Sequence, residues 1–214
     1  PIAQRSRKLF GEKLNSAKSA FNKLIEQGIL RASKSSWASP LTMVKKADGS
    51  WRPCGDYRML NNATEPDKYP LPRIHDLIDH ILQPTIFSKL DLEQAYHQIL
   101  IASEDCHKMA IITPFGLFEY THMPFGLKNS SQTFQRYMDQ ILRGTESFCI
   151  NYVDDILIFS NNKSEHEKQV NLILHKQGHR FSAGRGKPWK TAENEIFHGK
   201  PRKMRFFLKK RKNL

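Results

Sequence analysis

Residues 148–159 have the sequence FCINYVDDILIF, in which two apolar runs flank the adjacent carboxylates Asp154 and Asp155. Each run is short and bounded by polar residues, which predicts the two arms of a buried β-hairpin. Adjacent carboxylates repel each other, and partial burial raises the pKa of both, so the tip of such a hairpin is an unfavourable place for them. A divalent cation removes this difficulty, because hard cations bind carboxylate oxygens.

A third carboxylate follows another short apolar run. Asp91 comes directly after residues 86–90, Ile-Phe-Ser-Lys-Leu, which predict a strand. Three carboxylates at strand ends indicate a site for two metal ions and phosphoryl-transfer chemistry. Each signal is weak on its own, because Asp-Asp pairs are common on protein surfaces and a lone Asp often caps a following helix.

The period of two along a strand predicts which side chains of the hairpin share a face. Ile150, Tyr152 and Asp154 fall on one side. We therefore expect Asp154 on the working surface of the sheet and Asp155 at its margin.

The composition is that of a globular protein. The 214 residues are 39% hydrophobic and 26% charged, which suits one large domain or a domain with subdomains. No apolar run approaches the roughly 20 residues of a membrane span, so no membrane partner is expected. Residues 1–5 hold neither an initiator Met nor a signal-peptide pattern, and we expect a segment of something longer. Three widely spaced cysteines favour a reducing compartment over disulfides or a metal site: Cys54, Cys106 and Cys149.

The formal net charge of +13 is unevenly distributed. Residues 178–214 carry 12 Lys/Arg and 2 Asp/Glu, whereas residues 1–177 carry 22 and 19. Nucleic-acid binding through phosphate neutralisation is the interpretation for both parts. The tail has little apolar surface, so it is predicted to be disordered. Its cluster at 209–212, Lys-Lys-Arg-Lys, has three interpretations: a nucleic-acid contact, a nuclear address or a solvated tail.

Local patterns predict the other elements. Apolar residues at helical spacing, ended by Gly28, predict a helix at 11–27, and Asp48-Gly49 predicts a turn between two short strands within 44–53. The remaining expectations are an extended loop at 33–42, helices at 74–81, 129–144 and 164–176, and strands at 86–90, 108–113, 117–121, 147–153 and 156–159. His166, within Glu-His-Glu, is expected to be a solvated helix residue, and no Gly-x-Ser-x-Gly motif indicates a hydrolase.

Several motifs occur in an order and spacing that resemble one family. They are WASPL at 37–41, DGSWRPCGDYR at 48–58, FSKLDLEQAYHQI at 87–99, TPFGLFEY at 113–120, MPFGLKN at 123–129 and YVDD at 152–155. Together they resemble the reverse transcriptases of Ty3/gypsy-type long-terminal-repeat retrotransposons, over about residues 1–177.

The resemblance implies an α+β fold, the fingers and palm of a right-handed polymerase with an antiparallel palm sheet backed by helices. Fingers are expected at about 1–66 and 99–128, palm at about 67–98 and 129–177, and a disordered basic tail at 178–214. The implied activity is RNA-directed DNA polymerisation, adding dNTPs to a primer 3′-hydroxyl on an RNA or DNA template. A cytoplasmic location, within virus-like particles, is expected, with the nucleus as the alternative; no oligomeric state is indicated.

The resemblance also implies a role for each matching residue. Asp91, Asp154 and Asp155, with the Leu92 carbonyl, are expected to bind two Mg²⁺ ions, for which Mn²⁺ can substitute. Lys46, or Lys45 in its place, and Arg52 are expected to clamp the dNTP triphosphate. The remaining implied contacts are Tyr96 under the deoxyribose, Phe125 and Gly126 along the nucleotide pocket, and Tyr152 and Val153 at the primer terminus. Without the resemblance, the Lys45–Arg52 hairpin is a solvated cationic surface, and Tyr96 and Phe125 are ordinary core residues.

The chain departs from the family pattern after Gln177. The family's Lys-Cys-x-Phe and Phe-Leu-Gly-His segments and its thumb are not recognisable there, so a C-terminal truncation, a frameshift or a decayed copy is expected. The alternative function is therefore a catalytically inactive, nucleic-acid-binding remnant of such a polymerase.

Overall fold

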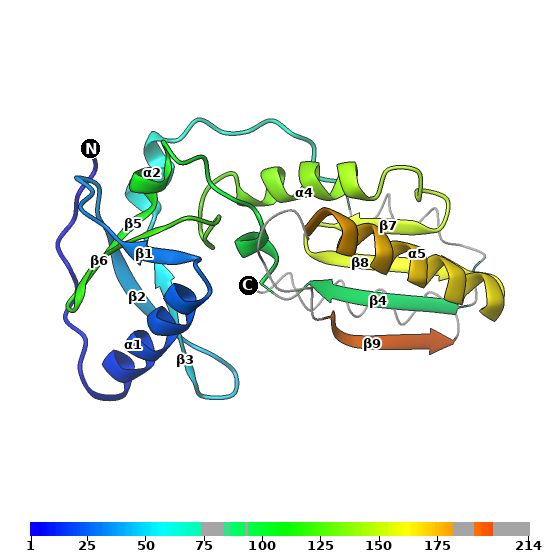
Figure 1. The fold of residues 1–214 in the computed structure, drawn as a ribbon, viewed down its shortest axis with the longest axis horizontal. Helices are drawn as coiled ribbons and strands as arrows, with labels where there is room; N and C mark the ends of the chain where they lie inside the picture. Colours follow the sequence, from blue (N-terminus) through cyan, green and yellow to red (C-terminus); the bar gives the residue numbers. More distant parts are fainter. Residues whose placement is uncertain (74–83, 85, 93, 182–190, 199–214) are drawn as a thin grey trace. The chain divides into compact units, whose positions relative to one another are not determined.

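The computed structural model describes residues 1–73, 84, 86–92, 94–181 and 191–198. They form two compact units, one comprising Pro1–Asp67 and Gln94–Ser130, the other Lys68–Glu93 and Ser131–Leu214. Each unit combines a sheet with helices, so the predicted α+β class is confirmed (Figure 1). The helix expected at 74–81 lies outside the described residues. None of the described helices is long and apolar enough to span a bilayer.

The first unit is built on a five-stranded sheet with the order β1-β6-β5-β2-β3. All neighbouring strands are antiparallel except β2 and β5, which run parallel. The strands are β1 (Leu30–Ala32), β2 (Ser39–Lys45), β3 (Trp51–Gly55), β5 (Ala110–Thr113) and β6 (Gly116–Tyr120). The helices are α1 (Gly11–Glu26), α2 (Arg58–Ala63) and the short 3₁₀ turns η1 (Ala95–Gln98) and η2 (Cys106–Met109).

Helix α1 packs on this sheet through the apolar face that its sequence predicts. Ala17 and Phe21 are buried, and the Phe21 ring meets Phe115 and Phe118 edge-on, with centroids 5.4 and 5.3 Å apart. Ile25, near the end of the helix at Glu26, is exposed. The predicted helix at 11–27 is confirmed.

The predicted Asp-Gly hairpin is also confirmed, between β2 and β3. The Lys46 amide donates to the Ser50 carbonyl over 2.8 Å, and Gly49 has a φ of +84°, which favours glycine. The loop expected at 33–42 is wrong from Ser39 onward. Residues 39 and 40 pair in parallel with Ile111 and Ile112, and this long-range contact extends β2.

The second unit is built on a four-stranded antiparallel sheet with the order β7-β8-β4-β9. Its elements are β4 (Ile86–Leu92), α4 (Ser130–Ile141), β7 (Cys149–Tyr152), β8 (Asp155–Ser160), α5 (Lys163–Phe181) and β9 (Thr191–His198). Helix α5 packs against β4 and β8 (Figure 1). Leu90 of β4 and Ile156 and Ile158 of β8 are fully buried on one face of the sheet. Every second residue of each strand points to the other face.

The predicted disorder of residues 178–214 is wrong for part of that segment. Residues 191–198 form β9, which pairs antiparallel with β4 so that Thr191 lies opposite Leu92 and His198 opposite Ile86. Helix α5 also continues to Phe181 rather than ending at 176. The pairing supplies hydrogen-bond partners for the backbone groups along the outer side of β4. The composition of residues 178–214 alone does not reveal this stabilisation.

The prediction that His166 is solvated is wrong. Its side chain is buried, with Nε2 2.8 Å from the Ser88 hydroxyl and Nδ1 2.8 Å from the Ser160 hydroxyl. The local sequence is polar, but residue 166 lies on the same helical stripe as Ile173, which is fully buried. That spacing is the signal that could have indicated burial.

Polar contacts continue from His166 along α5 and fix its tautomer. The Glu165 carboxylate only accepts, so the Gln169 amide donates to it through Nε2 over 3.1 Å. Gln169 Oε1 therefore accepts from the Ser160 hydroxyl. Ser160 Oγ in turn accepts from His166 Nδ1–H, and Nε2 accepts from Ser88. A directed chain of hydrogen bonds thus ties α5 to β8 and β4.

Candidate active site

The sheet of the second unit places two of the predicted carboxylates face to face. Asp91 of β4 lies directly opposite Asp155 of β8, and Tyr152 of β7 is the next residue in the same row. Directly opposite residues in an antiparallel pair have Cβ atoms about 4.5–5.5 Å apart. Because Ser88 faces α5, the alternation along β4 puts Asp91 on the other face of the sheet.

Two expectations about these carboxylates are corrected. Asp91 lies inside β4 rather than after its end, because Asp155 and Ala192 pair with it from the two neighbouring strands. Asp155 is not at the margin, since it shares the row with Asp91, whereas Asp154 occupies the turn between β7 and β8. The prediction for Asp154 and Asp155 continued the alternation of β7 past Tyr152, but the strand ends there and residues 153 and 154 form the turn.

The turn itself is held in an unusual conformation. Val153 has a φ of +54°, in the left-handed region that a β-branched residue rarely adopts and that costs about 1–3 kcal/mol. A two-residue hairpin turn requires a positive φ at its first position. The Val153 amide donates to Gln135 Oε1 over 2.8 Å, and both residues are buried, 6% and 1% exposed. Helix α4 thus supports the turn that carries Asp154.

A lysine supplies positive charge to this row. Lys89 Nζ lies 3.1 Å from Asp155 Oδ1, and the Asp155 side chain is 16% exposed. Within the described residues no group of three or more His, Cys, Asp or Glu is arranged as a metal site. The donor atoms of the row are nevertheless carboxylate oxygens, the ligand type that hard divalent cations bind, and Asp155 already pairs with the Lys89 ammonium.

The other residues predicted to bind metal or primer lie near this row. Leu92, whose carbonyl is the expected extra ligand, ends β4 opposite Thr191. Tyr152 ends β7 and is half-buried, whereas Val153 is buried.

The predicted nucleotide residues all lie in the first unit, and three of them meet. The Arg52 guanidinium lies 5.9 Å from the centroid of the Phe125 ring, and the Tyr96 ring meets Phe125 edge-on at 5.0 Å. These residues come from β3, η1 and the loop before α4. The structure therefore assembles an aromatic surface with one cation from segments far apart in the sequence.

The lysines of the β2–β3 hairpin differ in their surroundings. Lys45 Nζ lies 6.0 Å from the centroid of the Trp51 ring, and Lys13 Nζ lies over the same ring at 4.5 Å. Lys46 is exposed in the turn. Of the two lysines considered for the triphosphate, Lys46 is therefore the one outside the Trp51 contact.

Gly126 has a φ of +93°, and a residue that sequence reasoning missed holds its loop. Asn61 of α2 donates through Nδ2 to the Gly126 carbonyl over 2.8 Å and accepts the Lys128 amide through Oδ1 over 2.8 Å. Only a fold that brings α2 beside this loop could reveal Asn61, since nothing in its local sequence marks it.

His97 is a second residue that the sequence did not indicate. Its ring stacks on Tyr120 at 5.9 Å and meets Phe125 edge-on at 5.4 Å. Its Nδ1 atom is buried without a hydrogen-bond partner. Burial, with a smaller contribution from His122, lowers the pKa of His97 to about 4, so the imidazole is neutral at physiological pH.

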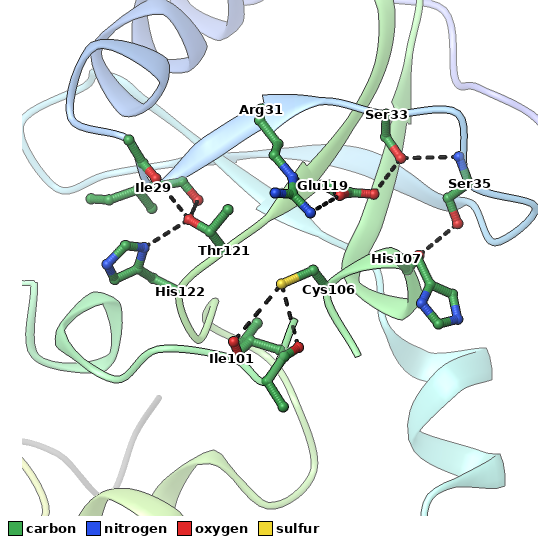
Figure 2. Close-up of polar contacts among 12 residues, drawn as sticks. Ile29, Arg31, Ser33, Ser35, Ile101, Cys106, His107, Glu119, Thr121 and His122 are labelled. Carbon is green, nitrogen blue, oxygen red and sulfur yellow. Dashed lines mark hydrogen bonds and ion pairs between the residues drawn. The ribbon is translucent and has the colours of Figure 1, made fainter. Parts of the chain in front are cut away.

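Glu119, at the β1–β6 edge of the same unit, holds a buried charge (Figure 2). Arg31 Nε donates to its Oε1 over 2.7 Å, and the Ser33 hydroxyl donates to Oε2 over 2.5 Å. Burial alone would raise the pKa of Glu119, but these two hydrogen bonds outweigh it and hold the pKa below its usual value. The cluster joins β1 to β6 and supports the fold.

The fold and its acidic row define the class of protein. The family model described as reverse transcriptase (RNA-dependent DNA polymerase) matches residues 44–180. This chain belongs to the reverse transcriptase family, and the resemblance stated from its motifs is confirmed.

Particular relatives agree with this assignment. The Tf2-3 and Tf2-7 transposon polyproteins of Schizosaccharomyces pombe are each 41% identical over 165 residues, which is 77% of this chain. The chain spans only 12% of the length of these curated relatives.

Solved structures show the same fold. The native protease-reverse transcriptase of prototype foamy virus has a TM-score of 0.78 at 23% identity, covering 94% of this chain and 26% of that one. A foamy viral protease-reverse transcriptase in complex with an RNA/DNA hybrid has a TM-score of 0.75 at 23% identity, covering 82% and 24%.

Proposed function

We propose that this chain is the polymerase domain of a retrotransposon polyprotein and adds dNTPs to a primer 3′-hydroxyl on an RNA or DNA template. The observation that carries the proposal is the pairing of Asp91 with Asp155 beside the turn of Asp154, in a chain of the reverse transcriptase family. The similarity to transposon polyproteins supports the origin. The complexes of related folds with double-stranded DNA and with an RNA/DNA hybrid support a template–primer partner.

In this proposal the second unit provides the metal ligands. Asp91, Asp154, Asp155 and the Leu92 carbonyl would hold two Mg²⁺ ions, or Mn²⁺ in their place. When bound, such ions supply activation of the 3′-hydroxyl and neutralisation of the leaving pyrophosphate. No side chain needs to act as a nucleophile, because positioning and charge neutralisation dominate phosphoryl transfer. Tyr152, beside Asp155 in the row, would contact the primer terminus together with Val153.

The first unit provides the nucleotide contacts. The Arg52 guanidinium would bind triphosphate oxygens in a fork, while Lys46 would add a point charge. The Tyr96 ring, held edge-on by Phe125, would occupy the space of a ribose 2′-hydroxyl and so select deoxyribonucleotides. Gly126, with its left-handed backbone, would let the template strand approach the loop closely.

Primer extension tests this proposal. Wild-type protein, Asp154→Asn and the control Asp105→Asn are compared on poly(rA)/oligo(dT) with dTTP and Mg²⁺. Asp105 is a half-exposed residue paired with Lys108 in the first unit. Extension by the wild type and by Asp105→Asn, lost in Asp154→Asn and in EDTA, is the expected result.

The alternative function gives a different result in the same assay. Duplex binding without extension, by folded wild-type protein in either Mg²⁺ or Mn²⁺, would contradict the proposal and identify a non-catalytic nucleic-acid-binding remnant. We place the working enzyme in the cytoplasm, within virus-like particles; its detection only in the nucleus would contradict that location.

A further inference from the structure

Behind the catalytic hairpin, α4 carries a set of hydrogen bonds that ends at the Val153 amide. Asp139 is the centre of this set. Its Oδ1 accepts from Gln135 Nε2 over 2.9 Å, one helical turn earlier, and its Oδ2 accepts from the Tyr69 hydroxyl over 2.6 Å. Gln135 Oε1 in turn accepts the amide of Val153. All four residues belong to the second unit.

The chemistry of Asp139 decides which way the Gln135 amide points. A carboxylate only accepts, so Gln135 must turn its NH₂ group toward Asp139. Its carbonyl oxygen is then the atom that faces the Val153 N–H. The opposite orientation would set two donors against each other at Val153 and two acceptors against each other at Asp139. The hydrogen bond that supports the turn therefore depends on a residue that does not touch the turn.

Tyr69 fixes Asp139 from the other side. Its hydroxyl donates to the carboxylate, and the Arg136 guanidinium lies 4.6 Å from the centroid of its ring. The hydrogen bond to Asp139 is the main cause that raises the pKa of Tyr69, so the hydroxyl stays a donor at physiological pH. Both oxygens of Asp139 are thus engaged, and the carboxylate is held in one orientation.

We propose that Asp139 and Tyr69 are positioning residues of the catalytic hairpin. They hold the Gln135 amide in the one orientation that accepts the Val153 N–H, and so keep Val153 left-handed and Asp154 in its place at the turn. Their proposed role is to hold the turn rather than to take part in the chemistry. The effect on rate rests on the proposed polymerase function, whereas the effect on the turn does not.

Selective isotope labelling can resolve the backbone amide signal of Val153. The chain contains three valines, Val44, Val153 and Val170, so protein labelled with [¹⁵N]valine gives three backbone amide signals. Hydrogen exchange at Val153 reports its bond to Gln135, while Val44 in β2 and Val170 in α5 report the integrity of the two units.

Three single substitutions form the first comparison. Asp139→Ala should accelerate exchange at Val153 on the order of tenfold or more, with Val44 and Val170 unchanged. Tyr69→Phe should accelerate it less, because Asp139 keeps its bond to Gln135. The matched control is Gln140→Ala, which truncates the neighbouring exposed residue of α4 and should leave all three signals unchanged.

The second comparison moves the carboxylate from residue 139 to residue 135. It distinguishes an effect of the Gln135 amide orientation from an effect of side-chain packing. Gln135→Glu places two carboxylates against each other and should release Val153. Adding Asp139→Asn restores a donor facing an acceptor, so the double variant should return exchange to within about threefold of wild type. The double variant keeps one carboxylate in the pair, as the wild type does.

Two results would overturn the proposal: unchanged Val153 exchange in Asp139→Ala, or a double variant no better protected than Gln135→Glu. If Asp139→Ala fails to fold, Tyr69→Phe and the second comparison still decide the question. In primer extension the single variants should lower kcat without weakening duplex binding, and the double variant should recover it. Wild-type protein that extends no primer, yet shows the expected exchange pattern, would contradict the polymerase proposal and leave the positioning role intact.

Discussion

At the residue scale, Lys89 compensates negative charge in the acidic row. Its ammonium lies 3.1 Å from Asp155 Oδ1, and Asp91 is two residues further along the same face of β4. Like charges placed directly opposite on neighbouring strands destabilise a sheet. Lys89 therefore stabilises this arrangement of the two strands, and a divalent cation would compete with it for Asp155.

The variant Lys89→Met tests this competition. In EDTA we expect a loss of about 1–2 kcal/mol in the free energy of unfolding, because the Asp155 charge loses its ion pair with Lys89. Mg²⁺ should restore more stability to the variant than to the wild type. The measurement is urea unfolding with and without Mg²⁺, and an equal effect of Mg²⁺ on both proteins would contradict the competition.

His97 gives the first unit a pH dependence whose sign follows from its pKa. Burial lowers that pKa to about 4 from 6.5, so the unfolded chain binds a proton there before the folded chain does. Stability is therefore lost as the pH falls from about 6.5 toward 4, by up to about 1.4 kcal/mol per pH unit. The lowered pKa of Glu119 adds its own loss only below about 4.5.

His97→Phe should flatten this dependence and raise stability at pH 5 by about 1 kcal/mol or more, since it also removes the buried Nδ1 that has no partner. His122, whose pKa burial also lowers, should leave a smaller slope of the same sign. Thermal unfolding between pH 5 and pH 7 measures the effect. A variant with the wild-type slope would show that His97 titrates normally.

At the scale of elements, the directed hydrogen bonds through His166 attach α5 to the sheet that carries the acidic row. Ser88 lies three residues before Asp91 on β4, and Ser160 ends β8, which begins at Asp155. The attachment therefore joins the two strands that bear the opposed carboxylates.

His166→Leu should destabilise this unit by about 2–4 kcal/mol, because two buried serine hydroxyls each lose a partner. Asn171→Leu, at an exposed position of the same helix, is the matched control and should change stability by less than about 0.5 kcal/mol. Urea unfolding compares the two variants. Equal losses in the free energy of unfolding for the two variants would contradict a stabilising role of the buried His166 hydrogen bonds.

At the scale of the whole molecule, local sequence patterns predicted the elements whose residues are close together in the sequence. The Asp-Gly turn, α1 and the two arms of the 148–159 hairpin follow from spacing and turn chemistry. Pairings between distant segments escaped prediction: residues 39–40 with 111–112, and 191–198 with β4. Their energy comes from partners far away in the sequence, and no local window contains it.

The candidate site follows the same division. Motifs indicated Asp91, Asp154, Asp155, Arg52 and Tyr96, because their residue types suit the chemistry. The supporting residues were missed, among them Lys89, Asn61, Gln135 and Asp139. Each acts through a neighbour that only the fold supplies, as Gln135 does through the Val153 amide.

The rate of a single dTMP addition to oligo(dT) on poly(rA), measured at saturating Mg²⁺ in wild type, Asp91→Asn and Asp155→Asn, tests the central claim most directly. Because the two carboxylates face each other across β4 and β8, each substitution should lower the rate on the order of 10³-fold while duplex binding is unchanged. A wild-type rate in either variant, or no addition by folded wild-type protein, would contradict the claim that this row is the catalytic centre.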